Sequence, residues 1–360
     1  MKYSVRGILL FLLIVLMISG CQPNQSASNI LFEEEEVGLA VNNEDLGHKN
    51  LSAYGFFTGI LADLVPAKNV YPYELNTPLF SDYAQKKRFI YLPEGSIIEY
   101  HPTQVFDFPV GTILIKNFYY KDAQLTDQKG GIIETRLLIK KADEWQGLPY
   151  IWNKEQTEAV LEITGGSRVV SLLGKQSINY QIPNMGQCKD CHQMNGTLQP
   201  IGPTAGQMNR NYLDDGGRLI NQLRRLSRLG LLSISEKEIF PKISVWNDPA
   251  SGSIDERARA YLEMNCAHCH RREGSAKNSG LYLMSSNHDR LELGIMKTPV
   301  AAGNGSGQLA YDIVPGDPDG SIMLYRMNST EPAVMMPELG RKMVHKEGVA
   351  LIRSWIASLK

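Results

Sequence analysis

The 360-residue sequence carries almost no net charge, because 37 lysines and arginines stand against 38 aspartates and glutamates. A chain without a charge surplus has no long-range field to attract nucleic acid or an anionic membrane surface, so no nucleic-acid partner is expected. Long apolar runs are also missing. The one notable run covers residues 8–18, which is shorter than the about 20 residues that a membrane-spanning helix needs.

Cysteine is scarce, with five residues in the whole chain. One cysteine stands at position 21, close after the apolar run, and the other four fall in two copies of the pattern C-x-x-C-H. We find no internal repeat apart from this doubled motif. The two copies consist of Cys188, Cys191 and His192, and of Cys266, Cys269 and His270.

The C-x-x-C-H pattern is the one that attaches a c-type haem covalently. Its two thiols can bond the two vinyl groups of one porphyrin, and the imidazole of the next residue ligates the iron. Two copies therefore predict two covalently bound haem c groups, with His192 and His270 as axial ligands. The alternatives are a thioredoxin-like thiol pair and a four-cysteine zinc site, neither of which uses the two histidines. His268, inside the second copy, keeps a mixed cysteine–histidine zinc site open.

The first twenty residues have the three zones of a secretory signal: a basic start, an apolar centre and small residues before Cys21. A cysteine directly after small residues resembles the lipobox of bacterial lipoproteins, where it is lipidated and becomes the mature N-terminus. Ile18 stands where leucine is commoner, and ordinary cleavage with a free Cys21 is the alternative. We expect lipidation of Cys21, no disulfide, and a protein tethered in the bacterial cell envelope, facing the periplasm or the exterior.

The residue pattern changes several times along the sequence, which predicts an α+β multidomain protein. After a signal peptide over 1–20, residues 21–50 are polar with an acidic run and read as a flexible tether. Residues 51–182 contain short β-branched and aromatic runs separated by turn residues, which predicts a β-sandwich-like domain; its role is unknown. A mainly α-helical haem-binding region is expected to follow, with the first haem in 183–252 and a cytochrome c-like domain with the second haem in 253–360.

Within this region, residues 218–229 predict a short amphipathic helix, because leucines recur there at helical spacing. Arg224, Arg225 and Arg228 lie off the apolar stripe. Their ordinary role is to form a solvated face. A sharper hypothesis is that one or two of them pair with haem propionates, because a buried carboxylate needs a charged hydrogen-bond partner.

The last hundred residues resemble a class I cytochrome c domain. Residues 253–256 have the form of a capping box at a helix start, and apolar residues over 351–359 recur at helical spacing. In the cytochrome c fold, such first and last helices pack on each other. The segments 314–321 and 336–340 look like the loop and the axial-methionine segment of small bacterial c domains. The order of parts, with Phe-Pro-Val-Gly-Thr at 108–112 before the first motif, also resembles bacterial dihaem c-type cytochrome lipoproteins.

A thioether is the expected second axial ligand, because this soft donor stabilises reduced iron and raises its potential. Met336, directly before a proline in the C-terminal loop, is our choice for the haem bound through His270. Met335 and His345 are the alternatives.

The haem bound through His192 has no equally good partner. Met194 follows His192 too closely to reach the opposite face of the same porphyrin. Met208 is the tentative ligand, and Met185 stays open as an alternative. An iron without a protein ligand on this side is a further alternative, and it would permit catalysis.

The resemblance implies electron transfer and names no donor. We expect a lipid-anchored dihaem cytochrome c that carries single electrons between redox protein partners, and we leave open whether it is also an enzyme. One alternative is a dihaem peroxidase-like oxidoreductase with an open site at the His192 haem. Another is a binding module in which the β-rich domain recognises a partner and the haems relay redox state.

Overall fold

The computed structural model of the chain describes most of the residues after position 45. Residues 42–360 form one compact unit, and the description below concerns this unit. The predicted signal peptide, Cys21 and nearly all of the predicted tether lie outside the described residues. None of the described helices is long and apolar enough to cross a membrane. The described ranges are 46–125, 130–213, 216–300 and 302–360.

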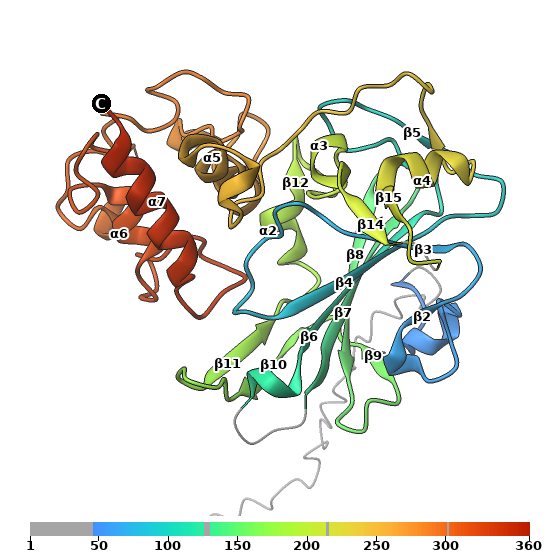
Figure 1. Ribbon diagram of the computed structural model, residues 1–360. Helices are drawn as coiled ribbons and strands as arrows, with labels where there is room; N and C mark the ends of the chain where they lie inside the picture. The colour runs from blue at the N-terminus through green and yellow to red at the C-terminus, as the bar shows by residue number, and fades with distance from the viewer. Residues whose placement is uncertain (1–45, 126–129, 214–215, 301) are drawn as a thin grey trace, which may run out of the picture. The chain divides into compact units, whose positions relative to one another are not determined.

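A six-stranded antiparallel sheet is the largest element of the unit (Figure 1). Strands that neighbour each other in the sheet are also close in sequence, so short connections suffice. β6 is buried along most of its length on both sides, which shows that both faces of the sheet are covered. In sheet order, the strands are β3 (Val70–Tyr73), β4 (Gln85–Tyr91), β6 (Ile113–Tyr120), β7 (Gly131–Lys140), β8 (Trp145–Trp152) and β9 (Ala159–Leu161).

The other strands form two-stranded pairs. Four of these pairs are antiparallel, and the fifth joins β5 to β16 in parallel. They are β1 (Phe57–Thr58) with β2 (Val65–Pro66), β10 (Gly166–Val170) with β11 (Ile178–Ile182), β12 (Gln193–Met194) with β13 (Thr197–Leu198), β14 (Asn211–Leu213) with β15 (Leu219–Asn221), and β5 (Ile98–Glu99) with β16 (Leu232–Ser233).

The described helices are short, and most follow the sheet in the chain. The α-helices are α2 (Cys188–His192), α3 (Ala205–Met208), α4 (Gln222–Arg228), α5 (Ile254–Asn265), α6 (Ile322–Met327) and α7 (Lys346–Ser358). The 3₁₀ helices are η1 (Leu51–Tyr54), η2 (Leu61–Asp63), η3 (Asp122–Gln124), η4 (Pro249–Ser251), η5 (Lys277–Ser279) and η6 (Gly303–Ser306).

Each face of the sheet has its own apolar core. On one face, Ile115 of β6 packs in a cluster with Leu51 of η1. On the other face, Leu114 packs in a cluster with Met208 of α3 and Leu223 of α4. Segments after the sheet therefore complete its second core. The domain boundaries expected at 182 and 252 stay predictions. The pairing of β5 with β16 joins segments that lie on either side of the boundary expected at 182.

The expected fold class is wrong. The described part of the chain is β-rich, with a six-stranded antiparallel sheet and only 22% helix, so neither a β-sandwich-like domain nor a mainly α-helical haem-binding region describes it. Apart from the longer helices α5 and α7, the region after the sheet is built largely from turns, hairpins and helices of one to two turns. The expected class included a class I cytochrome c fold for the C-terminal part, and this part of the expectation is wrong as well.

The segment 218–229 shows the physical reason. Its first residues extend and pair with β14 as strand β15, and the side chain of Asn221 then accepts hydrogen bonds from the backbone N–H groups of Leu223 and Arg224. This cap starts the helix at Gln222, so the predicted helix is cut to seven residues. The helical spacing of leucines contains no information about a neighbouring strand that pairs with the same residues.

The C-terminal helices agree with their local signals. Ser253 Oγ accepts a hydrogen bond from Glu256 N, and Glu256 Oε2 accepts one from Ser253 N, which confirms the capping box at the start of α5. α5 and α7 share one apolar core. Trp355 Nε1 of α7 also donates to Asp255 Oδ1 of α5 at 2.7 Å, so the predicted packing of these two helices is confirmed.

Candidate functional site

The first C-x-x-C-H copy forms α2, a single short helix directly after the sheet. Cys188 and Cys191, three residues apart in this helix, both line the cavity described below. The helix approaches β8 closely at Gly147, where an added Cβ would lie 3.0 Å from Cys188 Sγ. A glycine at this position therefore makes room for the motif against the sheet.

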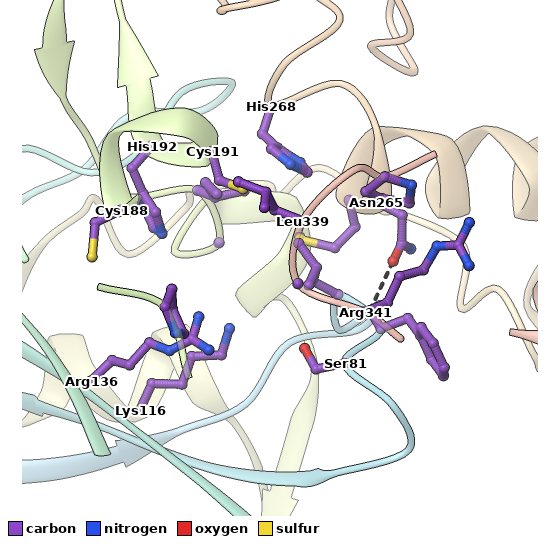
Figure 2. Close-up of a pocket in the computed structure, with 18 of the residues that line it drawn as sticks. Ser81, Lys116, Arg136, Cys188, Cys191, His192, Asn265, His268, Leu339 and Arg341 are labelled. Carbon is purple, nitrogen blue, oxygen red and sulfur yellow. Dashed lines mark hydrogen bonds between the residues drawn. The ribbon is translucent and has the colours of Figure 1, made fainter. Parts of the chain in front are cut away.

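Next to α2 lies a cavity of about 290 Å³ (Figure 2). Its walls come from three parts of the chain that are distant in sequence: the sheet, the first motif, and the C-terminal segment 336–342 with α5. Much of the lining is apolar, including Leu114, Ile201 and Met264. The polar and sulfur-bearing lining residues include Arg88, Lys116, Arg136, Cys188, Cys191, His192, His268, Met336 and Arg341.

The imidazole of His192 is held in one tautomer. Its Nδ1 lies 2.8 Å from the backbone oxygen of Gln199. A carbonyl oxygen only accepts hydrogen bonds, so Nδ1 carries the hydrogen and Nε2 keeps its lone pair. Burial lowers the pKa of His192 to about 4, which keeps the ring neutral. A neutral imidazole with a free Nε2 and an anchored Nδ1–H is the form that ligates a metal.

His270, at the end of the second copy, has an equivalent arrangement. Its Nδ1 lies 3.1 Å from Ser279 Oγ, and that hydroxyl donates its own hydrogen to Ala276 O at 2.7 Å. The hydroxyl can therefore only accept from His270, which again places the hydrogen on Nδ1 and the lone pair on Nε2. Burial lowers the pKa of His270 to about 4 as well.

The two copies touch each other. Cys269 Sγ and Ser275 Oγ both donate to the backbone oxygen of Asp190, at 3.4 Å and 3.0 Å. The loops that follow the copies are joined too, because Asn195 N donates to Glu273 O at 2.9 Å. The structure thus brings the two predicted haem attachment points side by side.

The four cysteines are free and partly exposed. A hydrogen bond between the thiols of Cys191 and Cys269 raises the pKa of Cys191 and lowers that of Cys269. Within the described residues, no group of three or more histidine, cysteine, aspartate or glutamate side chains is arranged to hold a metal ion.

These residues fit a covalently attached haem at the first copy. Two free thiols line an apolar-walled cavity, His192 has a free Nε2, and Gly147 leaves the space that a Cβ would take. At the second copy the thiols and His270 fit in the same way, although Cys266, Cys269 and His270 do not line this cavity.

Met336 lies on the wall of the cavity that contains His192. Its backbone N donates to Arg326 O at 3.1 Å. The sequence paired Met336 with His270, and this pairing stays a prediction.

The other ligand candidates lie in different surroundings. Met208 is fully buried in the apolar core beside the sheet and does not line the cavity. Met335 is buried, and Met185 packs with the core on the opposite face of the sheet. His345 lines the cavity, but its Nδ1 is hydrogen-bonded to Tyr261 OH at 2.9 Å.

Sequence reasoning missed the basic side chains of the cavity. It looked for propionate partners in Arg224, Arg225 and Arg228, none of which lines the cavity; Arg224 instead donates to backbone oxygens of Ser235 and Glu238. The available signal was Lys116, a charged residue in the middle of an apolar strand.

No protein-family model, curated protein or solved structure matches the chain.

Proposed function

We propose that this chain is an exported dihaem c-type cytochrome that carries single electrons between redox partners in the bacterial cell envelope. The observation that supports this function best is the tautomer shared by the two motif histidines. Each imidazole donates its Nδ1–H to a fixed acceptor, Gln199 O or Ser279 Oγ, and keeps Nε2 free. Nothing in a thiol-exchange pair requires histidines held in this way.

A bound haem supplies one-electron chemistry at its iron. The chain supplies the attachment and the surroundings. Its thiols anchor each porphyrin, His192 and His270 hold the irons, and apolar walls such as Leu114 exclude water from the first site. The contacts at Asp190 O keep the two attachment points together, which suits transfer of electrons from one site to the other.

A catalytic alternative is favoured by the cavity itself. Space beside His192 lined with basic side chains suits a small anionic or peroxide substrate at an iron that lacks a second protein ligand. This alternative is the dihaem peroxidase-like oxidoreductase. The spin state of the His192 haem separates it from pure electron transfer.

The first experiment measures covalent haem per chain after expression with a haem-attachment system. We expect two haems in the unchanged chain and one in each of Cys188→Ala plus Cys191→Ala and Cys266→Ala plus Cys269→Ala. Cys21→Ser is the matched control and should keep both haems, because this cysteine lies outside both motifs. A chain that leaves the export pathway without covalent haem would overturn the proposal.

On the same material, low-temperature EPR of the ferric protein separates the two roles. Two low-spin haems, with one becoming high-spin in Met336→Ala, favour electron transfer. A high-spin haem in the unchanged chain favours the catalytic alternative. Met208→Ala should cost about 2–5 kcal/mol of stability because it empties a core position, and an additional change of spin state would confirm Met208 as a ligand.

A further inference from the structure

Three basic residues form a straight row across the centre of the sheet. Arg88 of β4 is directly opposite Lys116 of β6, and Lys116 is directly opposite Arg136 of β7. All three side chains line the cavity beside His192. Figure 2 shows Lys116 and Arg136 pointing into this space from the strands and the ring of His192 pointing into it from α2.

Among the residues that the structure describes, only one of the three cations has a counter-ion. Arg136 donates to both carboxylate oxygens of Glu134, at 2.8 Å and 2.6 Å. Glu134 is completely buried and also accepts from Tyr180 OH, so it has little capacity left for the other two cations. The side chains of Arg88 and Lys116 make no hydrogen bond and no ion pair with any described residue, and Lys116 has only the ring of Phe118, whose centroid lies 4.7 Å from its Nζ.

Such a row is costly when nothing balances it. Like charges directly opposite on neighbouring strands repel each other, and a buried charge without a partner is strongly destabilising. Arg88 is only 8% exposed. Burial and the neighbouring cations lower the pKa of Lys116 well below its ordinary value, which shows how strongly the site disfavours a further positive charge.

The cavity does not supply the missing negative charge from its own walls. Its lining includes Arg341 and Lys342 in addition to the row, and its one carboxylate, Glu338, is exposed at the rim. Arg341 is already occupied, because it donates to backbone oxygens of Ser329, Met336 and Met343. The row therefore faces an enclosed space with a surplus of positive charge.

We infer that the row of Arg88, Lys116 and Arg136 is a built binding site for an oxyanion, occupied by the carboxylates of the haem attached at the first motif. A carboxylate in the cavity would neutralise the surplus and accept the free hydrogen bonds of Arg88 and Lys116. This assignment gives the sheet a function in the cofactor site. It rests on the proposed function, since a diffusible oxyanion has the same chemistry and is the other source.

The direction in which a substitution of Lys116 changes the unfolding midpoint tests the inference. In the haem-loaded full chain, Lys116→Met removes the charge and keeps the length of the side chain. If Lys116 pairs with haem carboxylates, the variant unfolds at a midpoint several degrees lower. If Lys116 has no anionic partner, the variant unfolds at the same or a higher midpoint, because an uncompensated buried charge has been removed. Lys87→Met is the matched control, since Lys87 is exposed on the same strand as Arg88.

Inorganic phosphate, compared with chloride at equal ionic strength, identifies the source of the anion. If haem carboxylates occupy the site, phosphate changes the unfolding midpoint of neither the unchanged chain nor Lys116→Met. With a diffusible oxyanion, phosphate raises the midpoint of the unchanged chain in a saturable manner and has no such effect on Lys116→Met. Absence of both a destabilisation by Lys116→Met and a phosphate effect overturns the site.

Haem content is measured on every sample, so failure of the proposed function is seen separately. A chain without haem loses the haem-carboxylate occupant, while the phosphate comparison still tests the oxyanion site. If Lys116→Met does not fold, Arg88→Met replaces it with the same expected signs, and Lys116→Arg should retain the midpoint of the unchanged chain.

Discussion

At the scale of single residues, the hydrogen bond at Nδ1 of each motif imidazole fixes the tautomer of the ring. The tautomer determines whether Nε2 has a free lone pair that can ligate a metal. Gln199 supplies a backbone oxygen to His192, and no side-chain substitution removes it. Ser279 supplies a hydroxyl to His270. The second contact is therefore the one that mutation can test.

Ser279→Ala should weaken coordination of iron by His270, because the substitution removes the acceptor that orients the ring. Loss of such an outer contact costs roughly 10–100-fold in metal affinity. Protons compete with iron for Nε2, so the acid-induced change to a high-spin spectrum should move to higher pH by about one to two units. Visible spectra recorded during an acid titration measure this shift. Ser286→Ala is the control, because Ser286 is exposed; an unchanged transition in Ser279→Ala would contradict the role.

At the scale of elements, the sheet carries charged residues where a sheet covered on both faces ordinarily has apolar ones. Lys86 lies on β4 two residues before Arg88 and donates to the backbone oxygen of Leu79 at 2.9 Å. Burial, with the charges of Arg88 and Arg136, lowers the pKa of Lys86 from 10.5 to about 7. The strand thus holds a lysine that titrates near neutral pH.

This shift predicts a pH dependence of stability. Between pH 7 and 10.5 the unfolded chain binds a proton at Lys86 that the folded chain does not, so the free energy of unfolding should rise with pH in this window. The contribution is at most about 1.4 kcal/mol per pH unit. Denaturant unfolding at several pH values measures it as the difference between the unchanged chain and Lys86→Met. Lys87→Met should keep the slope, and a slope in Lys86→Met as large as that of the unchanged chain would contradict the assignment.

At the scale of the whole compact unit, the cavity depends on contacts between the start of the sheet and the C-terminal segment. Asp82 is 2% exposed and precedes β4. Its carboxylate accepts hydrogen bonds from the backbone N–H groups of Lys342 and Met343 at 2.8–2.9 Å. Phe80 reinforces the contact by stacking on His345, with ring centroids 4.2 Å apart.

Asp82→Ala should weaken the contact with the C-terminal segment, because it leaves the backbone N–H groups of Lys342 and Met343 without their acceptor. We expect a loss of about 1–3 kcal/mol in the free energy of unfolding. Hydrogen exchange should become faster at the amides of Lys342 and Met343. Asp143→Ala, at an exposed position, is the control. Unchanged exchange at these two amides would show that the segment is held by other contacts.

The C-x-x-C-H copies are readable in the sequence because their chemistry depends on a few covalently adjacent residues. The capping box at Ser253 and the apolar stripe of α7 were readable for the same reason, since helix signals act over one or two turns. The strand β6 (Ile113–Tyr120) lies within 51–182, where short β-branched and aromatic runs predicted strands. The function remains a proposal built on these local patterns.

Only the tertiary structure decided how these parts meet. Residue spacing could not show that Arg88, Lys116 and Arg136 form one row, because strand register depends on pairing between distant segments. Nor could it show that residues 219–221 would pair as a strand and shorten the predicted helix, since Asn221 stops β15 and starts α4 only once β14 is beside it. The sequence by itself determined the chemistry of the two motifs, and tertiary packing decided their contact at Asp190 and the charge of the cavity, because both arise between residues far apart in the chain.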